Sequence, residues 1–451
     1  MEKFQKLGLS QPILELLEKA GINEPSEIQE KSIMPVMEGA DVIGSSATGS
    51  GKTLAFGAGI IERTEKGEGL QVLILTPTRE LAEQVGAVLR KFSSYKRLQV
   101  SMVYGGVSIE PQIRELGSAD IVVGTPGRIL DHIERGTINF HNVKTVVLDE
   151  ADRMLDMGFI QDVEKIIRRC PRERQTLLFS ATISEEIDEI SRRHMKNPVR
   201  VSAESYVDPE NLKQVYYDVS PGMKFSLLVH LLRDENSGLV MVFCNTRHSA
   251  DSLADNLKHA GIKAVAIHGG LEQNKRNRIL KSFHEKEIHV LVCTDVAARG
   301  LDIKGVSHVY NFDIPKTDKD YIHRIGRTAR AGEKGRVVNI LSNRDYDNFR
   351  EVIKNESLNI TPEEVPKIEI LPFERSRPER GSGRGFGSRG RDFGGRSPRS
   401  GRYSGRGRED RGGRAESRGY GRGGRTERSE RHETRGSHSR DYNSRRPARR
   451  Y

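Results

Sequence analysis

Short apolar runs alternate with amphipathic segments over two long stretches of the chain. In the first stretch, which ends near Val201, apolar residues between the runs recur at helical spacing, for example over Glu80–Phe92 and Pro111–Leu116. Alternating strands and helices predict a parallel sheet that is covered by helices on both faces. The predicted strands are Asp41–Gly44, Val72–Thr76, Ser101–Tyr104, Ile121–Gly124, Thr145–Asp149, Gln175–Ser180 and Val199–Val201.

A second alternating series follows and predicts a second domain of the same α/β class. It ends in a helical segment, Asn343–Asn355, and contains no glycine-lysine-threonine loop. Ahead of the first series, Gln11–Ala20 and a segment across residues 31–33 predict two further helices. The strands predicted in the second series are Gln214–Val219, Leu239–Cys244, Ala264–Ile267, His289–Cys293, His308–Phe312 and Gly335–Leu341.

Changes in composition divide the chain into five parts. We expect a helical lid over residues 1–31, a first α/β domain over 32–203 and a second over 213–372. Polar residues with few apolar anchors predict a linker over 204–212. From residue 373 to 451 the chain is mostly arginine, glycine and serine with single aromatic residues. This tail should be disordered, because it cannot bury enough apolar surface to offset its chain entropy.

The formal net charge of +11 is concentrated in the tail. From Arg375 to Tyr451 there are 24 arginines against nine acidic residues, so the preceding residues carry a net charge of −4. A tail with a charge of +15 predicts an acidic partner, most simply nucleic acid, whose phosphates pair with arginine and whose unpaired bases stack on Phe and Tyr. The alternative is a solvated terminus without a role.

The cysteines and the distribution of apolar residues indicate the cellular compartment in which the protein is expected. Cys170, Cys244 and Cys293 lie far apart and show no metal-binding spacing, so we expect buried thiols in a reducing compartment, without disulfides or zinc. The N-terminus is unlike a signal peptide, and no apolar run approaches about 18 residues. We therefore expect a cytoplasmic protein with a monomeric core and no membrane association.

A glycine-containing loop between the first strand and a helix carries the first candidate chemistry. Its backbone N–H groups would cradle a polyphosphate at the positive end of the helix. The Lys52 ammonium would reach the outer phosphates and the Thr53 hydroxyl would bind Mg²⁺. Serine stands at position 46, where such loops usually have glycine. The loop consists of Ser46, Ala47, Thr48, Gly49, Ser50, Gly51, Lys52 and Thr53.

Acidic residues follow the most apolar strand of the first domain, at Asp149, Glu150 and Asp152. Because ligands bind at the carboxyl ends of parallel strands, Lys52, Thr53, Asp149, Glu150 and Ser180 should belong to one site. One carboxylate there suits Mg²⁺ held through water, and its neighbour suits activation of the attacking water. The alternative is an ordinary acidic loop after a strand.

The chain resembles the DEAD-box RNA helicases, a family named after the tetrapeptide found here at residues 149–152. The resemblance extends from Phe4 to about Leu341 and implies two RecA-like domains that bind ATP and Mg²⁺. The lack of extensions around the core favours a bacterial or archaeal member. The matching motifs, in family order, are Phe4, Gln29, Gly51-Lys52-Thr53, Pro77–Ala82, Gly105-Gly106, Thr125–Arg128, Asp149–Asp152, Ser180–Thr182, Val242–Thr246, Gln273 with Arg276, Thr294-Asp295, Arg299–Asp302 and His323–Arg330.

The resemblance implies a role for each residue of the ATP site. Gln29 would bond two edges of adenine, next to Ser26, and Phe4 would stack on the base; the alternative is that Phe4 is a buried residue at the start of a helix. Asp302 would contact the ribose. Glu150 would be the catalytic base, and Asp149 with Thr53 would hold Mg²⁺.

The resemblance also implies how hydrolysis is coupled to RNA. Arg327 and Arg330 would be arginine fingers that reach the γ-phosphate only when the two domains close. Ala329 replaces the usual glycine of their motif, a change that should be tolerated. Residues implied to link hydrolysis to strand separation are Ser180, Thr182, Asp152, His323 and Arg324, of which the last two would pair with the acidic loop of the first domain.

RNA would lie across both domains and be bound through its backbone, with the 2′-OH selecting RNA over DNA. We therefore expect an RNA-stimulated ATPase that locally unwinds short duplexes or remodels RNA–protein particles, with RNA-decay or ribosome-assembly proteins as possible partners. Two alternatives stay open: a DNA-translocating helicase, and an RNA annealer with a vestigial ATPase. The implied RNA contacts are Thr78, Arg79, Gly105, Gly106, Thr125, Pro126, Gly127, Arg128, Thr246, Gln273, Arg276, Thr294 and Arg299.

Overall fold

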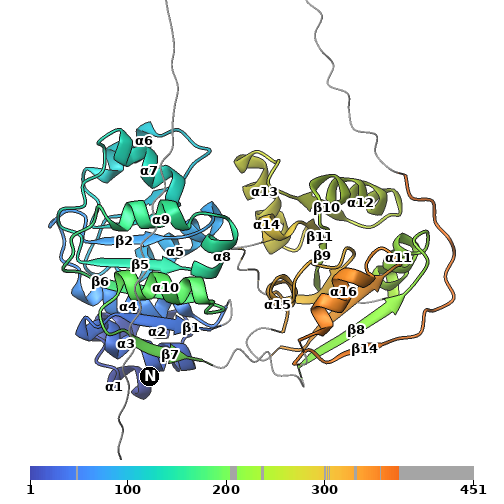
Figure 1. Ribbon diagram of the computed structural model, residues 1–451, viewed down its shortest axis with the longest axis horizontal. Helices are drawn as coiled ribbons and strands as arrows, with labels where there is room; N and C mark the ends of the chain where they lie inside the picture. Colours follow the sequence, from blue (N-terminus) through green and yellow to red (C-terminus); the bar gives the residue numbers. More distant parts are fainter. Residues whose placement is uncertain are drawn as a thin grey trace, which may run out of the picture. The chain divides into compact units, whose positions relative to one another are not determined.

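The structure is a computed structural model that describes residues 1–46, 49–203, 211–234, 238–298, 301, 303, 305–329, 333–355 and 357–374. These residues belong to one compact unit, Met1–Pro378. Two α/β domains are built from them (Figure 1). Among the helices of this part of the chain, none combines the length and the apolar character needed to cross a membrane.

The first domain is a seven-stranded parallel sheet in the order β3-β4-β2-β5-β6-β1-β7. Its strands are β1 (Val42–Ser45), β2 (Val72–Leu75), β3 (Val100–Val103), β4 (Ile121–Gly124), β5 (Thr145–Asp149), β6 (Gln175–Ser180) and β7 (Val199–Ser202). Its helices are α4 (Lys52–Arg63), α5 (Arg79–Phe92), α6 (Glu110–Leu116), α7 (Pro126–Glu134), α8 (Ala151–Asp156), α9 (Ile160–Ile167) and α10 (Glu185–His194).

Both faces of this sheet are buried, as the continuous apolar runs predict. Val72 and Ile74 pack into one apolar cluster, whereas Leu73 and Leu75 pack into another, because successive side chains of a strand point to opposite faces. All four side chains are at most 2% exposed. The predicted strands are confirmed, and their ends move by one or two residues at most.

Three helices precede the first sheet: α1 (Glu2–Lys6), α2 (Gln11–Lys19) and α3 (Glu27–Glu38). Phe4, Ile13 and Ile28 share one apolar cluster with Val42 of β1, so this segment is part of the first core rather than a separate lid. α3 also crosses the expected boundary between residues 31 and 32. The sequence analysis did not predict α1, which has only five residues.

The second domain repeats the architecture, with seven parallel strands in the order β10-β11-β9-β12-β13-β8-β14. Its strands are β8 (Leu212–Asp218), β9 (Leu239–Phe243), β10 (Ala264–Ile267), β11 (Val290–Cys293), β12 (Val306–Asn311), β13 (Gly335–Leu341) and β14 (Ile360–Pro362). Its helices are α11 (Lys224–Asp234), α12 (Arg247–His259), α13 (Gln273–His284), α14 (Asp295–Ala298), α15 (Asp318–Ile325) and α16 (Tyr346–Ile353).

The C-terminal part of the second domain differs from expectation. β14, an unpredicted three-residue strand that ends in proline, pairs with β8. After it, the side chain of Asn256 on α12 bonds both the N–H and the carbonyl of Glu374, and the Phe373 ring packs 5.2 Å from the Phe225 ring. The folded domain therefore continues past the expected boundary at residue 372. Of the expected linker over 204–212, residues 204–210 lie outside the described residues, as does the tail from 375, and Leu212 already begins β8.

Candidate active site

The loop after β1 is held by contacts within the first domain. Ser45 of β1 is paired with Ser180 of β6, and the Ser46 N–H donates to the Ser180 carbonyl, which places the loop at the carboxyl edge of the sheet. Gly51 caps α4 with φ +91°, and a Cβ there would lie 2.2 Å from Nε2 of Gln29. Only glycine fits this position, because the backbone is left-handed and Gln29 lies against it.

The Lys52 side chain starts α4 and is buried beside the acidic loop. Its Nζ donates to the Ser46 carbonyl at 2.6 Å. Burial lowers the pKa of Lys52, and the nearby carboxylates of Asp149, Glu150 and Asp152 oppose that shift. A cation is therefore held at the mouth of the loop, where Thr53 follows it half-buried on the first turn of α4.

Gln29 and Ser26 bind the loop rather than solvent. Together they form a capping box on α3, in which the Gln29 side-chain carbonyl accepts from the Ser26 N–H at 3.1 Å. The Gln29 amide donates to the Gly51 carbonyl at 3.1 Å, and the Ser26 hydroxyl donates to the Ser50 carbonyl at 2.7 Å. The Phe4 ring is fully buried in the apolar core. This observation favours the core residue over the predicted stacking of Phe4 on adenine.

Two buried carboxylates, Asp149 and Glu150, lie at the end of β5. Asp149 is 2% exposed and accepts the Glu150 N–H at 3.0 Å. Burial, together with the charge of Glu150, raises the pKa of Asp149 to about 7. Glu150 has a left-handed backbone (φ +52°), and its buried Oε2 has no hydrogen-bond partner. An unsatisfied buried carboxylate on a strained residue indicates a functional site rather than an ordinary loop.

Asp152 joins the acidic loop to the segment after β6. Its Oδ2 accepts from the backbone of Ala181 at 3.2 Å, and from the backbone and hydroxyl of Thr182 at 3.0 and 3.2 Å. In return, the Ser180 hydroxyl accepts from the Asp152 N–H at 3.1 Å. Burial works against ionisation of Asp152, but the neighbouring His323, Arg153 and Lys52 outweigh it and hold the pKa of Asp152 below its usual range.

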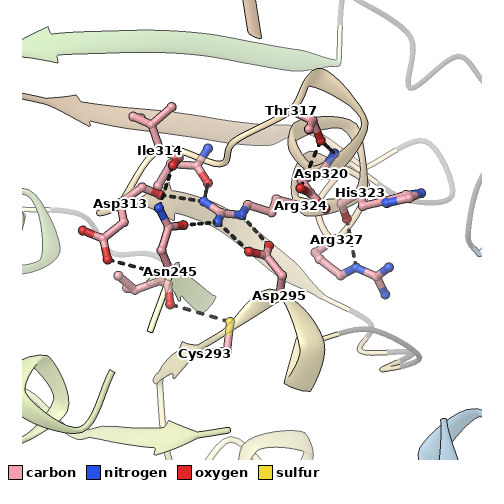
Figure 2. A network of polar contacts seen from close by, with 12 residues as sticks. Asn245, Cys293, Asp295, Asp313, Ile314, Thr317, Asp320, His323, Arg324 and Arg327 are labelled. Atoms are coloured by element: carbon pink, nitrogen blue, oxygen red, sulfur yellow. Dashed lines mark hydrogen bonds and ion pairs between the residues drawn. The ribbon is translucent and has the colours of Figure 1, made fainter. Parts of the chain in front are cut away.

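Arg324 is the centre of a polar network inside the second domain (Figure 2). Its guanidinium binds both carboxylate oxygens of Asp295, at 2.6 and 2.8 Å. It also donates to the side chains of Asn311 and Asn245 and to the Asp313 carbonyl. The expectation that Arg324 pairs with the acidic loop of the first domain is therefore wrong. The sequence could not show that four acceptors of its own domain surround this side chain.

His323 and Arg327 point away from the Arg324 network in Figure 2. His323 Nε2 lies 3.8 Å from Asp152 Oδ2, an ion-pair distance that is too long for a hydrogen bond. Burial lowers the pKa of His323. Arg327 is 3% exposed and donates to the carbonyls of His323 and Leu301.

Most of the predicted RNA-contacting residues line a cavity of about 500 Å³. It is also lined by the apolar side chains of Met157, Phe159 and Val296, which no motif of the sequence analysis included. Gly106, Pro126, Thr246 and Thr294 do not line it. The predicted contacts that do line it are Thr78, Arg79, Gly105, Thr125, Gly127, Arg128, Gln273 and Arg276.

Several of these residues are already bonded to protein. Arg276 is 7% exposed and forms an ion pair with Glu80 at 2.8 Å, and Gln273 donates to the same carboxylate at 3.1 Å. Glu80 was not among the predicted site residues, although it belongs to a quoted motif. A Cβ on Gly106 (φ +78°) would lie 1.8 Å from the Arg79 guanidinium, so glycine there makes room for arginine.

Two predicted RNA contacts are helix caps. The Thr78 hydroxyl accepts from the Leu81 N–H at the start of α5, and the Thr246 hydroxyl accepts from the Ser249 N–H at the start of α12. Predicted site residues outside the described part of the chain are Ala47, Thr48, Arg299, Asp302 and Arg330.

Two family models match the chain. Residues 26–190 match the model described as DEAD/DEAH box helicase, and residues 223–332 match the model described as helicase conserved C-terminal domain. The first matched region contains β1–β6, and the second contains β9–β12.

Solved structures with the same fold come from an archaeon and from yeast. A DEAD box protein from Methanococcus jannaschii is 41% identical, with a TM-score of 0.51 over 80% of this chain and 98% of that chain. Dbp5 of S. cerevisiae, bound to RNA and ADP BeF3, is 30% identical, with a TM-score of 0.74 over 80% of this chain and 95% of that chain.

Two curated relatives come from bacteria. The DEAD-box ATP-dependent RNA helicase CshA of Geobacillus kaustophilus is 48% identical over 356 residues, which are 78% of this chain and 76% of that protein. The ATP-dependent RNA helicase CshA of Listeria monocytogenes is 45% identical over 370 residues, 81% of this chain and 71% of that protein. The chain therefore belongs to the DEAD-box family of ATP-dependent RNA helicases.

Proposed function

We propose that the chain couples RNA-stimulated hydrolysis of ATP to local opening of short RNA duplexes, with the chemistry at the end of β5 and the RNA in the 500 Å³ cavity. The observation that carries the proposal is the buried carboxylate of Glu150, which has an oxygen without a hydrogen-bond partner. Asp152, in the same acidic loop, bonds the segment after β6.

ATP would bind over the loop between Ser46 and Thr53. Lys52 would exchange the Ser46 carbonyl for the β- and γ-phosphates, and the loop N–H groups would bond the remaining phosphate oxygens. Gln29 and Ser26 hold the carbonyls of Gly51 and Ser50, so they position the loop as well as offering polar atoms to adenine. The roles of Asp302 at the ribose and of Arg330 at the γ-phosphate rest on the family resemblance alone.

Mg²⁺ fits the donors at this edge of the sheet. No cluster of three or more His, Cys, Asp or Glu side chains within the described residues could hold a metal, so protein ligands alone do not make a site. Mg²⁺ typically uses one or two carboxylates together with substrate phosphates and water. Asp149, through water, and the Thr53 hydroxyl would supply the protein part. The ion would neutralise charge that develops on the phosphates.

Glu150 would take the proton of the attacking water. Its Oε2 is a buried acceptor that has an ion pair with Arg153 at 3.4 Å but no hydrogen bond, and the left-handed backbone at this residue fixes the direction of the side chain. Arg327, and Arg330 by resemblance, would stabilise the charge on the γ-phosphate from the second domain. Fingers of this kind contribute about 10³–10⁵ in rate.

Hydrolysis would be coupled to RNA through contacts that depend on both domains. Asp152 bonds the Ser180–Thr182 segment and lies 3.8 Å from His323, so a change at the phosphate can alter both. RNA would be bound by arginines, hydroxyls and backbone groups, which recognise the sugar–phosphate backbone rather than base sequence. The Arg/Gly-rich segment after residue 374 would add salt-dependent affinity.

The variant Glu150→Gln tests this assignment. It should bind ATP with nearly unchanged affinity and lose turnover by about 10²–10⁴-fold, because the amide cannot accept the proton. RNA-stimulated phosphate release and binding of a fluorescent ATP analogue would be measured on the full chain. Wild-type turnover in Glu150→Gln would refute the role, and equal stimulation by RNA and single-stranded DNA would refute selection by the 2′-OH.

A further inference from the structure

One surface of the first domain is basic, although residues 1–374 as a whole are acidic. These residues carry a net charge of −4, whereas the segments 164–174 and 189–196 within them together carry +5. The two segments contain the C-terminal parts of α9 and α10 and the residues that follow each helix. Concentrated positive charge on an acidic domain favours an anionic partner. We define the basic surface by the exposed side chains of Lys165, Arg168, Arg169, Arg172, Arg193 and Lys196.

Salt bridges hold the two segments together. Glu164 of α9 binds Arg193 of α10 at 2.7 Å and Arg168 of its own helix at 3.4 Å. In the loops that follow the two helices, Lys196 binds Glu173 at 2.9 Å. Figure 1 shows α9 and α10 side by side, and both pack into the same apolar cluster. The basic residues therefore form one surface rather than two.

Two arginines of the basic surface have no partner. The exposed side chains of Arg169 and Arg172 form no hydrogen bond or ion pair with any residue that the structure describes. The acids nearest in sequence, Glu164 and Glu173, are already bound to other cations. A guanidinium presents a planar fork of N–H donors that matches the oxygens of a phosphate. The surface therefore offers two free phosphate-binding groups.

α9 connects the basic surface with the cavity that we propose for RNA. Phe159, the residue that precedes α9, lines this cavity, and Arg168 follows the last residue of the helix. The helix has eight residues and is therefore about 12 Å long. Gln161, Lys165 and Arg168 are exposed along its outer side. Because a stacked strand advances about 3.4 Å per nucleotide, about four nucleotides beyond the cavity would reach Arg168.

We propose that the basic surface binds the phosphates of RNA that continues from the cavity along α9. The inference rests on the proposed function, in which RNA occupies the cavity. The Arg/Gly-rich segment after residue 374 is no alternative occupant, because its charge of +15 is repelled by the basic surface. Contacts to phosphates would lengthen the RNA site without reading the base sequence.

The double variant Arg169→Gln, Arg172→Gln tests the surface in the full chain. Since neither arginine has a partner, the change leaves the salt bridges of Glu164 and Glu173 intact. Fluorescence anisotropy would measure binding of a short RNA, and of the same RNA extended at its 5′ or its 3′ end by about eight nucleotides, enough to pass along α9.

One of the two extended RNAs should bind the double variant about 3–10-fold more weakly than the wild type, within the range for two exposed ion pairs. The short RNA should bind both proteins within about twofold. For that extended RNA, the slope of log K against log salt concentration should become less steep by about 1.4, because each phosphate contact to a single strand contributes about 0.7.

The double variant Lys66→Gln, Arg97→Gln is a matched control. Both side chains are exposed and have no partner among the described residues. They lie in the loops after α4 and α5, two helices that pack on the opposite face of the first sheet from α9. The control removes the same charge from the same domain and should bind all three RNAs like the wild type. The segment after residue 374 is identical in all three proteins, so its contribution cancels.

The proposal is overturned if the double variant at Arg169 and Arg172 binds both extended RNAs as the wild type does. It is also overturned if this variant loses the same affinity for the short RNA, or if the control variant loses as much. Weaker binding of a polyglutamate peptide beside unchanged RNA binding would assign the surface to an acidic protein segment instead.

Phosphate release by the wild type with the short RNA tests the proposed function separately. No stimulation of phosphate release would contradict the proposed function. Normal stimulation beside unchanged binding of the extended RNAs to the double variant would reject the basic surface alone.

Discussion

The two domains share one strand order but treat their polar residues differently. In each, a helix begins with a lysine shortly after the first strand: Lys52 starts α4 and Lys224 starts α11. Lys52 donates to a loop carbonyl and lies near Glu150, whose Oε2 accepts no hydrogen bond. Lys224 forms a salt bridge with Asp345 at 2.9 Å, and the same Asp345 oxygen accepts from the backbone and hydroxyl of Ser342.

The difference shows how one topology can serve two purposes. Buried polar groups are normally hydrogen-bonded, and the second domain follows that rule at the start of α11. The first domain leaves one oxygen of Glu150 without a hydrogen bond and holds Asp149 with a raised pKa. Such groups cost stability in the protein alone, and a polyphosphate with Mg²⁺ would compensate for them. Equivalent positions therefore serve ligand binding in one domain and stability in the other.

The largest effect that this comparison predicts is on turnover. Lys52→Gln should lower kcat/KM for ATP by at least about 10²-fold, because it removes a charge from the phosphates in the transition state. Lys224→Gln should leave the kcat of the folded protein unchanged. Phosphate release at saturating RNA would be normalised to the folded fraction. Comparable losses of turnover in both variants would remove the distinction between the two lysines.

For the free energy of unfolding, we expect the large effect at Lys224 rather than at Lys52. Lys224→Gln leaves the Asp345 carboxylate buried without its cation, which should lower the free energy of unfolding by about 3–5 kcal/mol. Urea denaturation followed by circular dichroism would measure this loss. Lys354→Gln is a matched control, because it breaks an exposed pair with Glu351 and should change stability little. A small effect of Lys224→Gln would show that Asp345 is satisfied without the lysine.

Asp149 of the first domain should make the stability of the protein depend on pH. The pKa of Asp149 is about 7 in the folded protein, above its ordinary value. Between pH 4 and pH 7 the folded state therefore holds a proton that the unfolded state has released, and stability falls as the pH rises. In EDTA without ATP, Asp149→Asn should be more stable than the wild type at pH 8 by up to roughly 4 kcal/mol, and by less at pH 5.

Thermal denaturation at the two pH values measures this difference. Mg²⁺ with ATP should then stabilise the wild type more than Asp149→Asn, because only the carboxylate can hold the ion. If Asp149→Asn is more stable than the wild type by the same amount at both pH values, the Asp149 carboxylate is not protonated near neutrality.

The fold could be predicted almost entirely from local pattern. Thirteen strands were predicted from short, mostly apolar segments, and the structure contains all of them. β14 escaped prediction because it is a three-residue edge strand that ends in Pro362, and its pairing with β8 is a tertiary contact. The predicted end of the second domain at residue 372 was wrong for the same reason. Phe373 belongs to that domain through its contact with the Phe225 ring, which is a tertiary contact.

The candidate site could be predicted as a set of residues but not as a set of bonds. Motif spacing placed Lys52, Asp149 and Glu150 at one edge of a sheet, which the register of the strands confirms. It could not show that Arg324 is enclosed by Asp295 and Asn311, or that Arg276 binds Glu80. These partners are distant in sequence, so no local pattern specifies them.

A residue with a left-handed backbone lies near the proposed site in both domains. Glu150 in the first domain and Ala329 in the second both have φ +52°. A left-handed conformation costs a residue with a Cβ about 1–2 kcal/mol, whereas glycine adopts it readily. At Glu150 a side chain is required for the proposed chemistry, so the strain is unavoidable. At Ala329 the side chain is a methyl group, and the strain has no such reason.

Ala329→Gly should therefore raise the free energy of unfolding, by at most about 1 kcal/mol, because the greater freedom of glycine in the unfolded chain offsets part of the relief. Urea denaturation would measure the change, with Lys286→Gly (φ +59°) as a matched control at an exposed turn of the same domain. If both variants gain equally, the strain at Ala329 is ordinary turn strain. If Ala329→Gly loses stability or slows turnover where Lys286→Gly does not, the methyl group stiffens the turn after Arg327, and strain serves function in both domains.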